Sequence, residues 1–239
     1  MTRSALGLSA RLSAIVVVSL CTVSSAAAET INLTFTSNGT PVTYNPNGGA
    51  ATTVGGGVFG WKQGTPLNAN FNTAVNTYCA ELNQGISLNQ TYTFTVERNL
   101  AAAPTVGTAA KAAAITSLFD RFYNTSLTSA ANQSAFQLAL WELTVDGVAN
   151  YSLSQGQIRA SNTTAQSWLD AVRNNTAYTN RDLAGKSLVA LVSATNQDQF
   201  TVVNNPTPQP AIPAPPAVIL AGIGLVGLAG RARFLRRAA

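Results

Sequence analysis

Residues 129–147, SAANQSAFQLALWELTVDG, have apolar side chains that recur at the spacing of an amphipathic helix. Thr128 or Ser129 suits the N-cap position, where a side-chain hydroxyl accepts a hydrogen bond from a backbone N–H of the first turn. Gly147 suits the end of the helix, because glycine enters the left-handed conformation at little cost. The sequence therefore predicts a long helix near the middle of the chain.

Two more helices are predicted on either side of this one. In residues 108–124, TAAKAAAITSLFDRFYN, one helical stripe contains four apolar side chains, which are Ile115, Leu118, Phe119 and Phe122. A third helix, NTTAQSWLDAVRN, is expected to begin near Asn162. The three predicted helices follow one another in a single section of the chain.

Strands are predicted before and after the helices. Residues 31–37 (INLTFTS) and 90–98 (QTYTFTVER) alternate between polar residues and β-branched or aromatic ones, as half-buried strands do. The runs 187–194 (SLVALVSA) and 198–204 (DQFTVVN) predict a hairpin that turns near Thr195. We therefore expect an α+β fold, in which a helical section is inserted into a β-rich layer of sandwich or barrel type.

Residues 1–28 have the pattern of a secretory signal peptide. A basic start is followed by the apolar run AIVVVSLC and by small residues before Glu29, which is the arrangement that signal peptidase cleaves. Cys21 lies inside this segment and is expected to be removed with it. Leu20 stands where a lipoprotein cleavage box needs Gly, Ala or Ser.

The other end of the chain has three parts, which are a proline-rich linker at 205–216, an apolar run at 217–230 and a basic tail at 231–239. The apolar run predicts a transmembrane segment although it is shorter than about 20 residues, and the arginines favour a cytoplasmic tail. This order resembles the PEP-CTERM sorting signal, although the motif at 213–216, PAPP, lacks the family's glutamate. The resemblance implies export, membrane insertion, cleavage by an exosortase and delivery to the cell surface or extracellular matrix. The alternative is an ordinary C-terminal membrane anchor.

Charge and composition exclude several functions. Two of the 14 lysines and arginines lie in the signal peptide and four in the basic tail, which leaves eight against nine acidic residues. The basic whole-chain pI is therefore no argument for a nucleic-acid partner. The chain has no histidine, so Ser-His-Asp and Cys-His catalysis and histidine zinc sites are excluded. We expect neither a metal nor a cofactor. The glycine-rich residues 48–60 lack the lysine of a phosphate-binding loop and predict a flexible loop leading into a strand.

Two short motifs point to one chemistry. Cys79, the single cysteine outside the signal peptide, follows an aromatic residue, and residues 136–141 have the sequence FQLALW. This pair resembles the thioester domain of bacterial surface adhesins, which has an aromatic residue before its cysteine and, downstream, apolar-Gln-x-Ala-apolar-Trp. The resemblance implies that residues 29–204 form such a domain, cross-linked between Cys79 and Gln137. It also implies supporting roles for four neighbours, which are Tyr78, Phe136, Ala139 and Trp141.

The chemistry implied by this resemblance is acyl transfer. The sulfur of Cys79 would attack the side-chain carbonyl of Gln137 and expel ammonia, which leaves an internal thioester. An amine or hydroxyl on a surface or matrix target would then take the acyl group, so the protein would be a single-turnover covalent adhesin rather than an enzyme. Tyr78 and Trp141 could keep water from the bond.

Three carboxylates near the motifs are candidate bases, namely Glu81, Glu142 and Asp146. The alternative for each is a solvated helix end or turn.

A noncovalent function is the alternative to the thioester. Gln137 alone would fit the polar edge of an amphipathic helix, and Cys79 alone would fit a buried free thiol that packs as a small hydrophobe. The protein would then be an extracellular matrix or polysaccharide-binding surface protein. An intact bond between the two side chains separates the two hypotheses.

Overall fold

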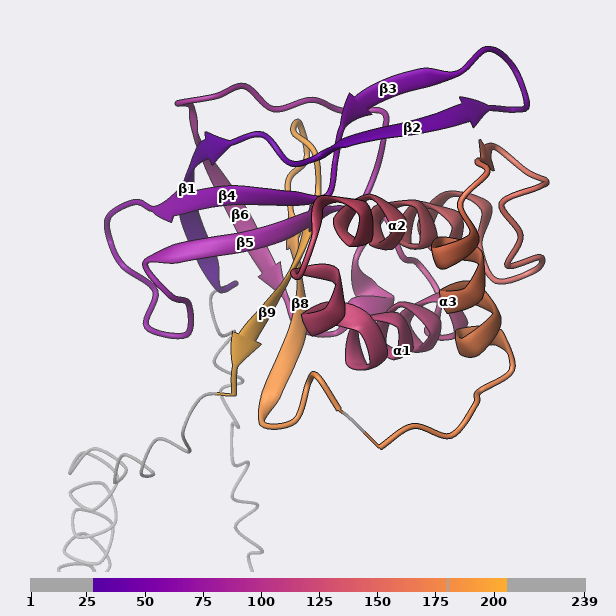
Figure 1. Ribbon diagram of the computed structural model, residues 1–239. Helices are drawn as coiled ribbons and strands as arrows, with labels where there is room; N and C mark the ends of the chain where they lie inside the picture. The colour runs from indigo at the N-terminus through magenta and orange to yellow at the C-terminus, as the bar shows by residue number, and fades with distance from the viewer. Residues whose placement is uncertain (1–27, 180, 206–239) are drawn as a thin grey trace, which may run out of the picture.

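Six antiparallel strands close into a barrel at one side of the molecule (Figure 1). The computed structural model describes residues 28–179 and 181–205. The strands follow the order β1 (Thr30–Ser37), β4 (Val58–Gln63), β5 (Ala74–Cys79), β9 (Gln199–Asn204), β8 (Lys186–Val192) and β6 (Thr91–Glu97). In β1 the alternation is plain, because Ile31, Leu33 and Phe35 are buried while the residues between them are partly exposed.

A smaller antiparallel sheet lies against the helices, with the order β3 (Thr52–Gly55), β2 (Pro41–Pro46) and β7 (Ile158–Arg159). Its central strand, β2, packs against the helix α2 (Ala130–Trp141). Val42 and Tyr44 are the buried side chains of β2, and the Tyr44 ring centroid lies 5.7 Å from that of Trp141. This sheet therefore covers the end of α2 that carries Trp141.

Three α-helices and a short 3-10 helix lie between β6 and β8, namely η1 (Leu100–Ala102), α1 (Ala109–Ser126), α2 and α3 (Thr163–Arg173). The side chains of Thr108, Ser129 and Asn162 cap the three α-helices by accepting a backbone N–H. After α2 the chain continues as a π-helical turn, η2 (Glu142–Asp146). Gly147 ends this turn with a φ of 81°.

An aromatic cluster joins the barrel to the helices. Phe136 on α2 lies 4.5 Å from Tyr78 on β5 and 4.9 Å from Phe119 on α1, measured between ring centroids. Phe119 also contacts Phe200 on β9 at 6.2 Å. All four side chains are buried, and each such burial stabilises the fold by roughly 1.5–3 kcal/mol. The helices and the barrel consequently share one core, which extends to the end of β5.

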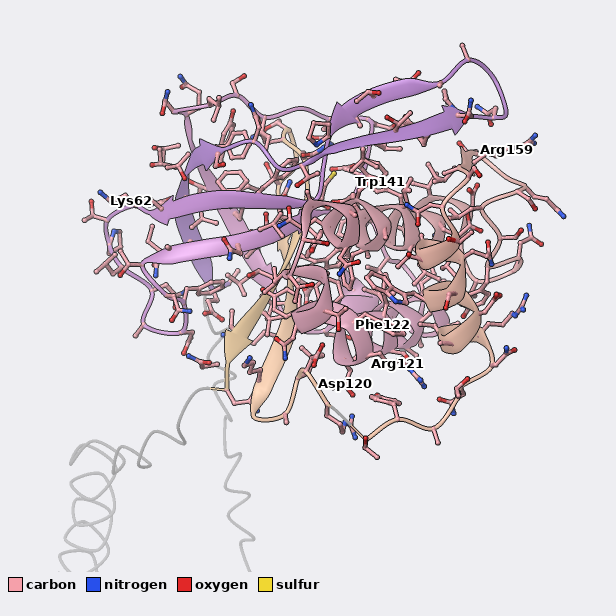
Figure 2. The ribbon with its side chains drawn as sticks, in the orientation of Figure 1. Lys62, Asp120, Arg121, Phe122, Trp141 and Arg159 are labelled. Carbon is pink, nitrogen blue, oxygen red and sulfur yellow. The ribbon has the colours of Figure 1, made fainter. Side chains whose placement is uncertain are left out.

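A buried carboxylate fastens the segment after α3 to α1. Asp120, labelled in Figure 2, accepts hydrogen bonds from Tyr178 Oη at 2.5 Å, Arg181 Nε at 2.8 Å and Leu183 N at 3.1 Å. Burial alone would raise the pKa of Asp120, but the hydrogen bonds from Tyr178 and Arg181 lower it below its usual value. Arg121, on the same helix, stacks on the Tyr178 ring at 3.9 Å.

The structure confirms the α+β prediction, with a barrel-like layer and the glutamine motif in an inserted helical section. The three helices and the hairpin of β8 and β9 lie where the sequence predicts them. The prediction of one continuous α-helix up to Gly147 is wrong at its end, because α2 ends at Trp141 and a π-helical turn begins at Glu142. The glycine-rich residues 48–60 lead into a strand, β4, as predicted, but they also contain β3, so a flexible loop describes only part of this stretch.

Among the described residues, no helix has the length and apolar character needed to cross a membrane. The predicted signal peptide, sorting motif, transmembrane segment and basic tail lie outside the described residues.

Candidate functional site

The side-chain amide of Gln137 pairs with the backbone of Cys79. The Cys79 N–H donates to Gln137 Oε1 at 3.1 Å, and Gln137 Nε2 donates to the Cys79 carbonyl oxygen at 2.8 Å. Both residues have 0% of their surface exposed. The two residues that the motifs single out, although distant in sequence, are therefore in direct contact in the core.

Local structure explains why this pair forms. Cys79 is the last residue of β5, and α2 passes beside the end of that strand. A buried amide needs hydrogen-bond partners for its oxygen and nitrogen, and the Cys79 backbone supplies both for Gln137. Gln137 is thus a core residue, and the polar edge of an amphipathic helix does not describe its position.

The thiol of Cys79 is buried, in surroundings that favour its neutral form. Its Sγ donates to the carbonyl oxygen of Glu81 at 2.6 Å. Burial raises the pKa of Cys79 to about 12, against a smaller lowering from the indole N–H of Trp141. Nε1 of Trp141 has no hydrogen-bond partner among the described residues. At neutral pH the sulfur needs a proton acceptor before it can act as a thiolate.

Aromatic and small side chains surround the pair. Tyr78, Phe136, Ala139 and Trp141, the supporting residues that the resemblance implies, are all buried. The Tyr78 hydroxyl donates to Ser126 Oγ at 2.6 Å, which satisfies its polar end inside the core. Trp141, labelled beside α2 in Figure 2, packs against the ring of Tyr44. This packing keeps bulk water away from Cys79 and Gln137.

Gly56 allows the chain between β3 and β4 to approach Gln137. A Cβ at Gly56 would lie 2.6 Å from Cγ2 of Val42 and 3.3 Å from Cγ of Gln137. Its neighbour Gly55 has room, since a Cβ there would meet only the Phe59 ring at 3.9 Å. The glycine-rich stretch thus contributes a close backbone contact behind the glutamine.

The candidate bases have different environments. Asp146 accepts the backbone N–H groups of Gln157 at 2.7 Å and Ile158 at 2.8 Å, so it anchors β7. Glu142 is completely buried, with Oε1 accepting from Ser152 N at 2.9 Å. Burial raises the pKa of Glu142 to about 8. A solvated position, the alternative considered for both residues, is wrong for Glu142.

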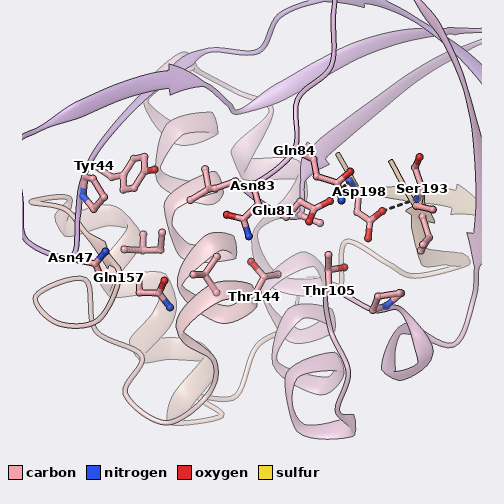
Figure 3. Close-up of a pocket in the computed structure, with 18 of the residues that line it drawn as sticks. Tyr44, Asn47, Glu81, Asn83, Gln84, Thr105, Thr144, Gln157, Ser193 and Asp198 are labelled. Atoms are coloured by element: carbon pink, nitrogen blue, oxygen red, sulfur yellow. Dashed lines mark hydrogen bonds between the residues drawn. The ribbon is translucent and has the colours of Figure 1, made fainter. Parts of the chain in front are cut away.

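Glu81 lines a cavity of about 910 Å³ beside Cys79 (Figure 3). A second carboxylate, Asp198, lines the same cavity and was not among the residues predicted from the sequence. Oε1 of Glu81 accepts the backbone N–H of Asp198 at 2.9 Å, and Asp198 Oδ1 accepts that of Ser193 at 2.7 Å. Asp198 is 3% exposed, and burial, followed by the charge of Glu81, raises its pKa to about 6. No local sequence signal marks Asp198, because only the pairing of β5 with β9 brings it to Cys79.

Within residues 28–179 and 181–205, no group of three or more metal-ligating side chains could hold a metal ion.

No protein-family model and no curated protein matches the sequence. Among solved structures, the chain is similar to the N-terminal thioester domain of a surface protein from Clostridium perfringens, with 12% identity and a TM-score of 0.37. The alignment covers 60% of this chain and 86% of that domain. Because the sequence identity and the TM-score are both low, this similarity carries no functional argument.

Proposed function

We propose that Cys79 and Gln137 form an internal thioester, and that the protein uses it to attach covalently to a target at the cell surface or in the surrounding matrix. The observation that supports this most directly is the two-point pairing of the Gln137 amide with the Cys79 backbone in a fully buried site.

The pairing suits thioester formation. The Cys79 sulfur attacks Cδ of Gln137, and the negative charge that develops on Oε1 is stabilised by the Cys79 N–H that already donates to it. The carbon–nitrogen bond then breaks, and Nε2 leaves as ammonia with the proton of the thiol. A carboxamide is a poor electrophile, so the reaction depends on positioning, which can be equivalent to effective molarities of 10⁵–10⁸ M.

The thioester stores an acyl group for a second reaction. A nucleophile on the target attacks Cδ of Gln137, the carbon–sulfur bond breaks, and the Cys79 thiol is released. The product is an amide or ester bond between the two molecules. Because nothing regenerates the thioester, each molecule acts once, as an adhesin does and an enzyme does not.

The intact mass of the freshly purified domain tests this proposal. We expect a mass lower by one ammonia than the sequence requires. Methylamine should raise it by one methylamine and expose one titratable thiol. A full mass with a free thiol, once hydrolysis to glutamate at Gln137 is excluded, would instead support a noncovalent matrix or polysaccharide-binding protein.

Gly56→Ala should slow thioester formation, because the added Cβ would lie 2.6 Å from Cγ2 of Val42 and 3.3 Å from Cγ of Gln137 and would push both side chains aside. The fraction of protein that has lost ammonia at a fixed time after expression is the measurement. We expect a drop of roughly tenfold for a shift of a few tenths of an ångström, since a misplacement of about 1 Å can cost roughly 100-fold in rate. Gly55→Ala is the matched control, since its Cβ has space. Equal thioester fractions in the two variants would show that Gly56 does not position Gln137.

A further inference from the structure

The thioester-forming step proposed above uses none of the side chains that line the cavity beside Cys79. Resting on the proposed function, we propose that it binds the acyl acceptor, that this acceptor is a primary amine in its cationic form, and that Glu81 and Asp198 hold the ammonium group while Asp198 takes its proton.

The cavity lies directly against the reacting pair. Ala80 and Glu81, which follow Cys79 in the chain, line it, and so does Asp198. The Ala80 N–H donates to the Asp198 carbonyl oxygen at 2.9 Å, which fixes β9 beside the end of β5. On the other side, Tyr44 lines the cavity while its ring packs against Trp141. An acceptor in this cavity would therefore approach the site from the side of Ala80 and Glu81.

The electrostatic character of the walls favours a cation. None of the described residues that line the cavity is lysine or arginine, whereas two are carboxylates. Figure 3 shows Glu81 and Asp198 toward one end of the cavity and Tyr44 and Asn47 toward the other. Opposite charges attract more strongly in a partly buried site than in water, because the effective dielectric constant there is lower.

One buried acceptor on the same walls, Oε1 of Gln84, has no hydrogen-bond partner and belongs to a residue toward the carboxylate end in Figure 3. The Thr105 hydroxyl at that end makes no well-formed hydrogen bond, but it is a donor close enough to Asp198 to lower the pKa of that carboxyl slightly. Buried acceptors without a donor are uncommon in proteins. An ammonium group has three N–H donors and a hydroxyl has one donor. A protonated amine can therefore donate to more of the oxygen atoms that line the cavity than an alcohol can.

The proposed step balances in atoms and charge. The bound R–NH₃⁺ gives one proton to the Asp198 carboxylate, and the free R–NH₂ attacks Cδ of Gln137. The carbon–sulfur bond breaks, the nitrogen gives its second proton to the departing sulfur, and the products are the amide and the Cys79 thiol. Protonated Asp198 then returns its proton to solvent. With a pKa raised to about 6 by burial, Asp198 is still ionised at neutral pH and can accept this proton.

Two small nucleophiles provide the test, because methylamine is cationic at neutral pH while methoxyamine is neutral. The ratio of their rates of thioester consumption is measured by intact mass for the wild type, Asp198→Asn and Glu81→Gln. We expect Asp198→Asn to lower the ratio of methylamine to methoxyamine rates about tenfold and Glu81→Gln to lower it less. Asp170→Asn on α3, which removes one exposed carboxylate away from the cavity, should leave the ratio unchanged.

Asp198→Asn should fold, because asparagine keeps the Oδ1 atom that accepts from Ser193 and the core favours a neutral side chain there. A measurement on the wild type adds an independent check. Trimethylammonium, which cannot form a stable amide, should slow the methoxyamine reaction by occupying the cavity, and no slowing would contradict a cation site.

The outcomes distinguish the two proposals. A wild-type protein that never loses ammonia overturns the thioester and the acceptor site together. A thioester that forms normally, with the rate ratio unchanged in Asp198→Asn and Glu81→Gln, overturns the acceptor site alone.

Discussion

Cys79→Ala and Gln137→Ala should each abolish covalent capture of a biotinylated amine, a loss below detection rather than a partial decrease. Cys79→Ala removes the nucleophile, and Gln137→Ala removes the acyl group. No other thiol can replace the nucleophile, because Cys79 is the only free cysteine among the described residues. Capture is read as biotin attached to the denatured protein, so that only covalent products count.

Cys79→Ala is the cleaner of the two variants. Gln137→Ala leaves the buried N–H and carbonyl of Cys79 without partners, which costs about 1–3 kcal/mol for each group. Thermal unfolding must therefore show that this variant is folded. Gln133→Ala is the matched control, because Gln133 lies one turn earlier on α2 and bonds Thr40 rather than Cys79. Capture that survives either Cys79→Ala or Gln137→Ala would refute the mechanism.

The stability of the domain should fall as the pH rises from about 5 to 8, and Glu142 should cause much of this fall. Its pKa is about 8 in the folded protein, chiefly because of burial, against 4.5 for an ordinary glutamate. Between these values the unfolded chain binds fewer protons at this position than the folded protein does. The contribution of Glu142 to the free energy of unfolding is therefore fully present below pH 4.5 and is lost as the pH rises through 8. The total loss is at most about 5 kcal/mol.

Glu142→Gln should remove this dependence. Glutamine keeps the oxygen that accepts from Ser152 and stays neutral, so the variant should match the wild type near pH 5 and exceed it by a few kcal/mol above pH 8. Urea unfolding at a series of pH values is the measurement, carried out in the Cys79→Ala background so that thioester chemistry does not contribute. Asp170→Asn, an exposed change, is the control. Identical pH profiles for Glu142→Gln and its parent would show that Glu142 is not protonated in the fold.

Local sequence signals predicted the elements with strong periodicity or capping. The helices start after Thr108, Ser129 and Asn162, because a capping side chain and an apolar stripe act within a few residues of each other. Strands β3 and β5 were missed for opposite reasons. β3 is short and exposed, while β5 carries the buried polar Thr77, whose hydroxyl donates to Gln199 on β9, so neither shows clean alternation.

The α+β class and the positions of the three helices follow from residue type and spacing, which act locally along the chain. The choice of Cys79 and Gln137 as a candidate pair rested on the resemblance of two short motifs to the thioester domain. Three features of the site became visible only in the tertiary structure. Gln137 is buried against the Cys79 backbone, and the missing side chain of Gly56 leaves space for Gln137. Asp198 lines the cavity beside Cys79. Each of these depends on the closure of the barrel onto α2, a contact between distant segments that no local pattern encodes.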